Sequence, residues 1–134
     1  MFATTLANKA GVSPDTVRYY TRIEMLKPDR NPDNGYRVYK KADVRRLRFI
    51  LAARSLGFTL KDIKGIFSDA EQGESPCPRV RSVLELRMAD AERRLRELNE
   101  LHAKMEAALA SWSHLPDSHP TGDSVCTLIE SINA

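Results

Sequence analysis

Two cysteines, Cys77 and Cys126, carry the most distinctive chemistry in this sequence. The first residues lack the charged start and apolar core of a secretion signal, so we expect a cytoplasmic, reducing location where a structural disulfide is disfavoured. Each cysteine is then either a small packed side chain or a thiolate with a task. Cys77 directly precedes Pro78 at the start of a predicted helix, where free amide groups and the helix dipole favour a thiolate.

Charge is divided unevenly along the chain. The formal net charge is +3, but residues 1–66 hold 14 Lys and Arg against 6 Asp and Glu, a net of +8, and residues 67–134 hold 7 against 12, a net of −5. A basic half favours a polyanionic partner, most simply nucleic acid, over a merely solubilising surface. No run of about 18 apolar residues occurs, so we expect no membrane span.

The basic half begins with the pattern of a helix-turn-helix. Small and apolar residues from Leu6 onward predict a short helix that Gly11 stops. Ser13 and Pro14 have the residue types of an N-cap and a first helical position, and they start a second helix that we expect to reach about Met25. Two short helices joined by a glycine-centred turn make a helix-turn-helix.

A β-ribbon and two further helices are predicted next. Prolines and the Asn34-Gly35 turn signal exclude a helix before residue 40, and residues 36–39 have strand propensity, which resembles the wing of a winged helix-turn-helix. Thr59, with Asp62 three positions later, predicts a capping box for a later helix. The helix predicted between the wing and Thr59 has an apolar face: Val44, Leu47, Ile50, Leu51 and Leu56.

The acidic half contains one long predicted helix, from Pro78 to about Ser111, with no internal glycine or proline. Its apolar positions are spaced alternately by four and three residues, the repeat of a coiled coil. We call these residues the seam: Leu84, Met88, Ala91, Leu95, Leu98, His102, Met105 and Leu109. The preceding domain is too small to cover such a helix. We therefore expect a second copy of the chain to pair with it in antiparallel orientation, as a homodimer.

The last residues are predicted to form a loop and a short closing helix. Pro116, Pro120 and Gly122 keep the segment irregular, and Ser124 could cap a helix that includes Cys126. The expected architecture is mainly α. It consists of a winged helix-turn-helix over residues 1–75, a long antiparallel coiled-coil dimerisation helix over residues 76–112, and a short metal-binding loop with a terminal helix over residues 113–134.

Three segments together resemble the MerR family of transcriptional regulators: GVSPDTVRYY at residues 11–20, NGYRVY at residues 34–39 and ARSLGFTLKDI at residues 53–63. The likeness extends from about residue 3 to residue 130. Thr21 departs from the family, which usually has an acidic residue there. The resemblance implies a dimer that binds a promoter palindrome in double-stranded DNA. Upon effector binding it distorts the DNA, so that RNA polymerase can use the promoter.

The family resemblance also assigns contacts to DNA. A recognition helix in the major groove needs short and planar polar residues near its N-terminal half. The residues that fit this helix are Ser13, Thr16, Arg18 and Tyr19. Tyr36 and Arg37 on the wing, and Arg54 beyond it, look like the family's contacts to the DNA backbone, whereas Tyr20 is expected in the core. A surface tyrosine that packs on its own hairpin is the alternative for Tyr36.

A cysteine at the start of the dimerisation helix resembles the branch of the family that senses divalent zinc, cadmium, lead or mercury. The predicted ligands are Cys77 of one copy and Cys126 of the other, with His114, His119 or both, and Asp117 as a weaker candidate. Two thiolates with imidazole suit tetrahedral zinc, the favoured ion, and mercury could bind to thiolates alone. This chain lacks the further loop cysteine that such sensors usually have.

Three other functions compete with this one. A small organic or redox effector acting through the cysteines is the alternative within the same family. An enzyme is rejected, because no nucleophile–base spacing, phosphate loop or paired carboxylates occur. A structural coiled-coil adaptor leaves the basic, winged half without a purpose.

Overall fold

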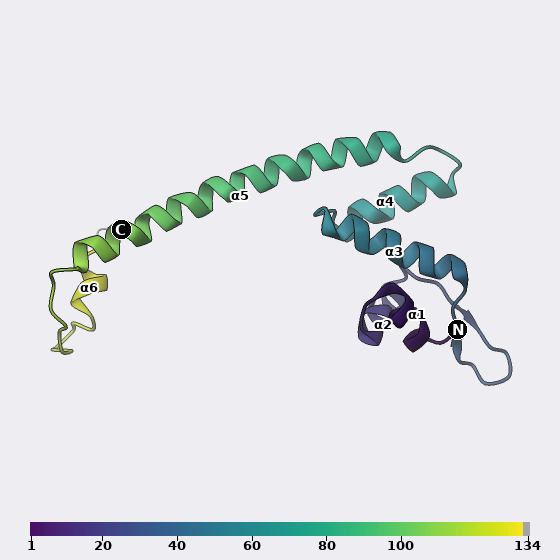
Figure 1. The fold of residues 1–134 in the computed structure, drawn as a ribbon, viewed down its shortest axis with the longest axis horizontal. Helices are drawn as coiled ribbons and strands as arrows, with labels where there is room; N and C mark the ends of the chain where they lie inside the picture. Colours follow the sequence, from purple (N-terminus) through teal and green to yellow (C-terminus); the bar gives the residue numbers. More distant parts are fainter. Residues whose placement is uncertain (133–134) are drawn as a thin grey trace. The chain divides into compact units, whose positions relative to one another are not determined.

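The computed structural model describes residues 1–132 and is mainly helical (Figure 1). The chain divides into two compact units, one from Met1 to Arg87 and one from Met88 onward. The elements in chain order are α1 (Ala3–Ala10), α2 (Pro14–Arg22), β1 (Asp29–Arg30), β2 (Arg37–Val38), α3 (Lys41–Ser55), α4 (Leu60–Glu71), α5 (Cys77–Trp112) and α6 (Thr127–Glu130). The predicted helix-turn-helix, wing and long helix are confirmed. The antiparallel pairing stays a prediction.

Local signals place the helix-turn-helix as expected. Gly11 ends α1 in the left-handed conformation at φ 72°, and the Oγ of Ser13 caps α2 by accepting the N–H of Thr16 at 3.3 Å. α2 ends at Arg22, earlier than the predicted Met25. Glu24 has a φ of 63°, and the N–H groups of Met25 and the next residue both donate to the carbonyl of Tyr20. This turn places Met25 in the core, with 1% of its surface exposed.

The wing is shorter than predicted, because only two residues on each side pair. Asp29 lies opposite Val38 in the antiparallel register of β1 and β2. Tyr39 leaves the strand and is buried, with its hydroxyl 2.7 Å from the Oγ1 of Thr21. The Thr21 hydroxyl donates its single hydrogen to the carbonyl of Val17 at 2.8 Å, so Tyr39 must be the donor to Thr21. This chain of hydrogen bonds attaches the wing to α2.

α3 contributes a buried face to the core, but one predicted residue is wrong. Val44, Leu47 and Ile50 are buried and Leu51 is half-buried, whereas Leu56 is 57% exposed. The helix ends at Ser55, and the chain turns through the residue that follows Leu56 at a φ of 87°. Helical periodicity therefore does not apply at Leu56. Its place in the core is taken by the residues that follow, since Phe58 is 2% exposed.

Asp62 joins α4 to the first part of α5. Its Oδ2 accepts the N–H of Thr59 at 2.8 Å, and its two carboxylate oxygens accept hydrogen bonds from Arg87 at 3.0 and 3.2 Å. The capping box predicted from Thr59 and Asp62 is therefore confirmed. Burial disfavours the charged form of Asp62, but the hydrogen bonds from Arg87 and Thr59 outweigh it and hold the pKa of this carboxyl below its ordinary value.

Replacing Asp62 by Asn is expected to lower the free energy of unfolding by about 1–3 kcal/mol at pH 7, because it weakens charge-assisted hydrogen bonds and half of a capping box. A depressed folded-state pKa means that the carboxylate stabilises the fold above its unfolded-state pKa, near 3.8. That stabilisation is lost as the pH falls through the lower folded-state pKa. Urea unfolding of both proteins at pH 7 and about pH 2 measures the effect. An equal difference at both values would contradict it.

α5 is a single helix of 36 residues, and none of them is buried. Five seam residues expose more than half of their surface: Met88 (56%), Leu95 (60%), Leu98 (61%), Met105 (55%) and Leu109 (68%). Leu84, at the start of the seam, is half-buried against the core of the first unit. A helix of this length gains most of its stability from packing, so an uncovered apolar seam indicates a missing partner. No helix within residues 1–132 is long and apolar enough to cross a membrane.

The cap of α6 differs from the prediction. Cys126, not Ser124, is the N-cap residue. The carboxylate of Glu130 accepts the N–H of Val125 at 2.7 Å and that of Cys126 at 3.4 Å, and it accepts the hydroxyl of Ser124 at 2.8 Å. These hydrogen bonds, foremost the one from Val125, hold the pKa of Glu130 below its ordinary value. A side chain inside the helix thus binds the amides that we expected Ser124 to cap.

Candidate nucleic-acid interface and candidate metal ligands

Three of the predicted DNA-contact residues line one surface hollow in the first unit. Arg18 comes from α2, and Tyr36 and Arg37 come from the wing, together with Phe2, Ala3 and Tyr39. The hollow has a volume of about 230 Å³. The fold therefore brings together side chains that are almost twenty positions apart in the sequence, on the helix-turn-helix and on the wing.

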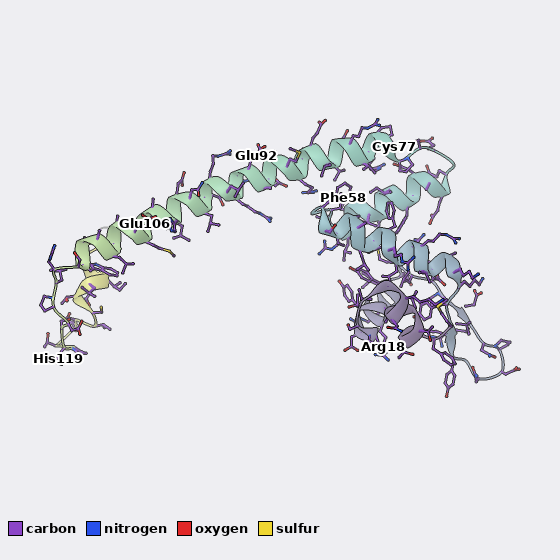
Figure 2. The ribbon with its side chains drawn as sticks, viewed as in Figure 1. Arg18, Phe58, Cys77, Glu92, Glu106 and His119 are labelled. Carbon is purple, nitrogen blue, oxygen red and sulfur yellow. The ribbon has the colours of Figure 1, made fainter. Side chains whose placement is uncertain are left out.

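Arg18 is exposed on α2 (Figure 2) and forms only a weak local ion pair. Its Nη1 lies 3.0 Å from the Oδ1 of Asp15, and the two side chains are 53% and 92% exposed. Surface pairs of this kind contribute little, so the guanidinium can leave Asp15 for a phosphate or a base edge at small cost. Tyr19, 39% exposed, packs edge-on against Tyr20 and lies beneath the guanidinium of Arg22. Tyr20 is buried as predicted.

The hydroxyl groups of Ser13 and Thr16 are hydrogen-bonded to each other, and Ser13 also caps α2. Their hydroxyl oxygens are 3.1 Å apart, and the amide of Thr16 donates to Ser13. Ser13 is exposed and Thr16 is half-buried. The first task of Ser13 is to start α2. A contact from Ser13 to DNA would use the remaining hydrogen-bonding capacity of its hydroxyl.

The wing residues are exposed, and Arg54 lies apart from the hollow. Tyr36 is 62% exposed with its ring edge-on to Phe2, so it packs on the N-terminal segment and not on its own hairpin, which was the alternative to a DNA contact. Arg37 is exposed on β2. Arg54 is near the end of α3, where its Nη1 donates to the carbonyl of Phe58 at 2.9 Å. This bond orients Arg54 and leaves its other N–H groups for an anion.

Sequence reasoning did not single out four residues that the structure places near this surface or on its flanks. Phe2 supports Tyr36, and Arg48 donates to the backbone carbonyl of Lys9 at 3.0 Å, so the Arg48 guanidinium lies at the end of α1 that carries Lys9. Lys40 pairs with Asp29 across the base of the wing at 2.6 Å, and this hydrogen bond raises the pKa of Lys40 above its ordinary value. The only sequence signal for these cations was the charge of the basic half.

Both cysteines are free thiols in positions where a ligand could reach them. Cys77 is the exposed first residue of α5, as Figure 2 shows, and its N–H donates to the Oγ of Ser75 at 3.3 Å. Cys126 is half-buried at the start of α6. His114, His119 and Asp117 are exposed in the loop that joins α5 to α6. Within residues 1–132 of a single chain, no group of three or more His, Cys, Asp or Glu is placed to hold a metal ion.

The second unit is held together by hydrogen bonds around this loop. The indole Nε1 of Trp112 donates to the hydroxyl of Ser131 at 3.3 Å, and the hydroxyl of Thr127 donates to that of Ser118 at 3.0 Å. These bonds fold α6 against the end of α5 and thereby determine where Cys126 and the loop histidines lie. The predicted ligands are therefore distributed between the start of α5 and the loop–α6 segment.

Two family models match the chain. The one described as MerR HTH family regulatory protein matches residues 1–70, and the one described as MerR, DNA binding matches residues 44–108. Among curated proteins, the HTH-type transcriptional regulator ZntR of Escherichia coli K12 is 33% identical over 102 residues, which are 75% of this chain and 72% of ZntR.

Two solved structures are also similar. The transcription regulator PbrR691 of Ralstonia metallidurans CH34, in complex with lead(II), has a TM-score of 0.77 and 22% identity and covers 98% of both chains. MerR of Bacillus megaterium MB1, in complex with mercury(II), has a TM-score of 0.60 and 28% identity and covers 93% of both chains. The first likeness shows the fold alone, and the second adds a closer sequence relation.

Proposed function

The chain belongs to the MerR family of DNA-binding transcriptional regulators and is not an enzyme, and from this premise we propose that it is a metal-responsive regulator that works as a homodimer. The observation that carries the proposal is the position of its two free cysteines. Cys77 begins a long helix whose apolar seam is uncovered in one chain, and Cys126 lies beyond the other end of that helix. In an antiparallel pair, each copy covers the seam of the other. Cys77 of one copy then lies near the loop and Cys126 of the other copy.

Dimerisation is supported by the apolar area that the seam exposes. Five Leu and Met side chains in each chain are 55–68% exposed. Ten such side chains in a pair gain roughly 1–2 kcal/mol each for the part that becomes buried. This gain is comparable with or larger than the association cost of about 4–15 kcal/mol. The pair also presents two helix-turn-helix units, as a palindromic operator requires.

The effector is proposed to be a divalent soft metal, with zinc favoured and cadmium, lead and mercury as the other candidates. Two thiolates and one or two imidazoles from His114 and His119 form a set that zinc accepts in tetrahedral geometry. The similar regulator from Bacillus megaterium was solved with mercury(II). A site shared by two copies couples metal binding to dimer geometry. The metal can therefore shift the dimer toward the state that distorts promoter DNA for RNA polymerase.

The experiment that tests this proposal is a zinc and cadmium titration of the reduced, full-length protein. A far-ultraviolet thiolate-to-metal charge-transfer band that saturates at a fixed metal-to-dimer ratio supports a shared thiolate site. Binding to a palindromic duplex is then measured with and without the metal. The absence of such a band, with a DNA complex whose shape neither ion changes, would reject zinc and cadmium as effectors and favour an organic or redox effector instead.

Replacing Arg18 by Ala is expected to weaken binding to the operator by about 1–3 kcal/mol, the usual contribution of an arginine that pairs with a guanine edge. If Arg18 contacts phosphate instead, the loss is similar on specific and unrelated duplexes, and the slope of affinity against salt becomes shallower. Fluorescence anisotropy at several salt concentrations on both duplexes distinguishes the two contacts. Arg93, an exposed arginine of α5 paired with Asp90, is the matched control when replaced by Ala. Unchanged affinity in the Arg18 variant would remove this residue from the interface.

A further inference from the structure

The seam of α5 has the same residue types in both directions, apart from one pair, when it is divided between Leu95 and Leu98. Outward from that point, Leu95 corresponds to Leu98, Ala91 to His102, and Met88 to Met105. Leu84 corresponds in the same way to Leu109. A helix that pairs with a second copy of itself in antiparallel orientation places such corresponding positions in the same layer, because a two-fold axis crosses the pair at its centre.

From this symmetry we infer that two copies of α5 pair in one register, with the two-fold axis between Leu95 and Leu98, and that His102 of each copy packs on Ala91 of the other. The inference rests on the proposed homodimer and specifies its geometry. In this register Leu faces Leu and Met faces Met. The one small residue of the seam, Ala91, faces its one polar ring, His102.

The neighbouring registers are less favourable for steric reasons. Moving one helix by seven residues in either direction leaves two residues of each seam without a partner. It also places Ala91 against leucine, which leaves a void, and His102 against leucine, which desolvates the imidazole without a partner. With His102 over Ala91, the ring has room to keep its bond to Glu106, whose Oε1 is 2.7 Å from the Nδ1 of His102. A polar residue inside a coiled-coil seam commonly fixes the register in this way.

The register also has a consequence for the proposed effector site. It places Cys77 of one copy about one helical turn beyond the level at which α5 of the other copy ends, at Trp112. The loop that carries His114 and His119 starts directly after Trp112. A shift of seven residues would move the sulfur about 10 Å along the axis relative to this loop. The Ala91–His102 layers therefore act as positioning residues for the shared site.

Disulfide trapping in the full-length chain tests the register. In a background with Cys77→Ser and Cys126→Ser, the double variant Met88→Cys with Met105→Cys is expected to give almost complete covalent dimer upon mild oxidation. The two positions are 17 residues apart on one helix, about 25 Å, so they cannot bond within one chain. Met88→Cys alone should remain monomeric on a non-reducing gel. Met88→Cys with Leu98→Cys, which reports the one of the two shifted registers that places Met88 opposite Leu98, should cross-link poorly.

A residue exchange tests the role of the Ala91–His102 layers. Ala91→His alone and His102→Ala alone should each weaken dimerisation by about tenfold, since each creates two mismatched layers. Combining them restores one histidine and one alanine in each layer and should return the dissociation constant to within about threefold of the wild type. Sedimentation equilibrium measures all four proteins, and circular dichroism verifies their helicity.

The possible failures of the two proposals are distinguishable. Efficient self-cross-linking of Met88→Cys would show parallel helices. Preferential cross-linking of Met88→Cys with Leu98→Cys would show the shifted register, and a combined variant no better than the single ones would remove the role of the layers. Each outcome overturns the inference while metal-responsive regulation could stand. A monomeric protein overturns both.

Discussion

Replacing Cys77 by Ser is expected to abolish the metal response while leaving apo DNA binding unchanged. A serine hydroxyl does not replace a thiolate as a zinc ligand at neutral pH. Even outer-shell partners of metal ligands change affinity by about 10- to 100-fold, so loss of a ligand should exceed that range. Cys77 is exposed and bonded only locally, to Ser75, so its replacement does not disturb the core of the first unit.

Competition against a chromophoric chelator measures zinc affinity in this variant, and anisotropy on the operator measures DNA binding. Cys126→Ser should have the same effect, because both thiolates belong to one site. Ser82→Ala, an exposed change on the same helix, is the matched control and should respond normally to zinc. If either cysteine variant keeps the wild-type zinc affinity and response, the proposed site is wrong.

The loop histidines separate zinc from mercury in the same assay. His114→Ala and His119→Ala together should weaken zinc binding strongly, because a tetrahedral zinc needs ligands beyond two thiolates. Mercury, which can bind to two thiolates alone, should be affected much less. Equal effects on both ions would show that the histidines act by supporting the fold of the loop. No effect on zinc would remove them from the ligand set.

Helix ends that depend on nearby residue types were predictable from the sequence, whereas features that depend on contacts between distant residues were not. Gly11, Ser13 and Thr59 bond to backbone groups within a few residues, so the helix ends that they flank followed from residue type alone. Leu56 was misplaced because helical periodicity was continued past the end of α3. Ser124 was misassigned because the carboxylate that binds the free amides comes from the last residue of α6, which N-cap rules do not consider.

The candidate sites show the same division. Arg18 and Tyr36 were each recognisable, but the hollow that they share depends on the Tyr39–Thr21 contact that attaches the wing to α2. No sequence pattern encodes that contact. The metal ligands are a harder case, since the described part of one chain holds no complete ligand cluster. In the proposed homodimer their assembly depends on how two copies pair, and the seam is the sequence feature from which we infer this pairing.

Replacing Leu98 by Glu is expected to prevent dimerisation at micromolar concentrations and to reduce operator affinity by several orders of magnitude. In the proposed pair Leu98 of each copy faces Leu95 of the other at the two-fold axis, so one substitution buries two unpaired carboxylates at the centre of the interface. An uncompensated buried charge costs about 3–5 kcal/mol, and symmetry doubles it. A monomer can engage only one half of a palindrome, so operator affinity falls when dimerisation is lost.

Leu86 provides the matched control for this prediction. It is on the same helix and is 61% exposed, as Leu98 is, but it lies off the seam. The same leucine-to-glutamate change at Leu86 should therefore leave the protein dimeric and able to bind the operator. Sedimentation velocity and anisotropy compare the two variants, and circular dichroism verifies that the first unit remains folded in both. Because the two leucines are equally exposed in a single chain, a difference between the variants can arise only from the partner that covers one of them. Equal behaviour would mean that the seam is not the dimer interface, and the shared metal site would lose its basis.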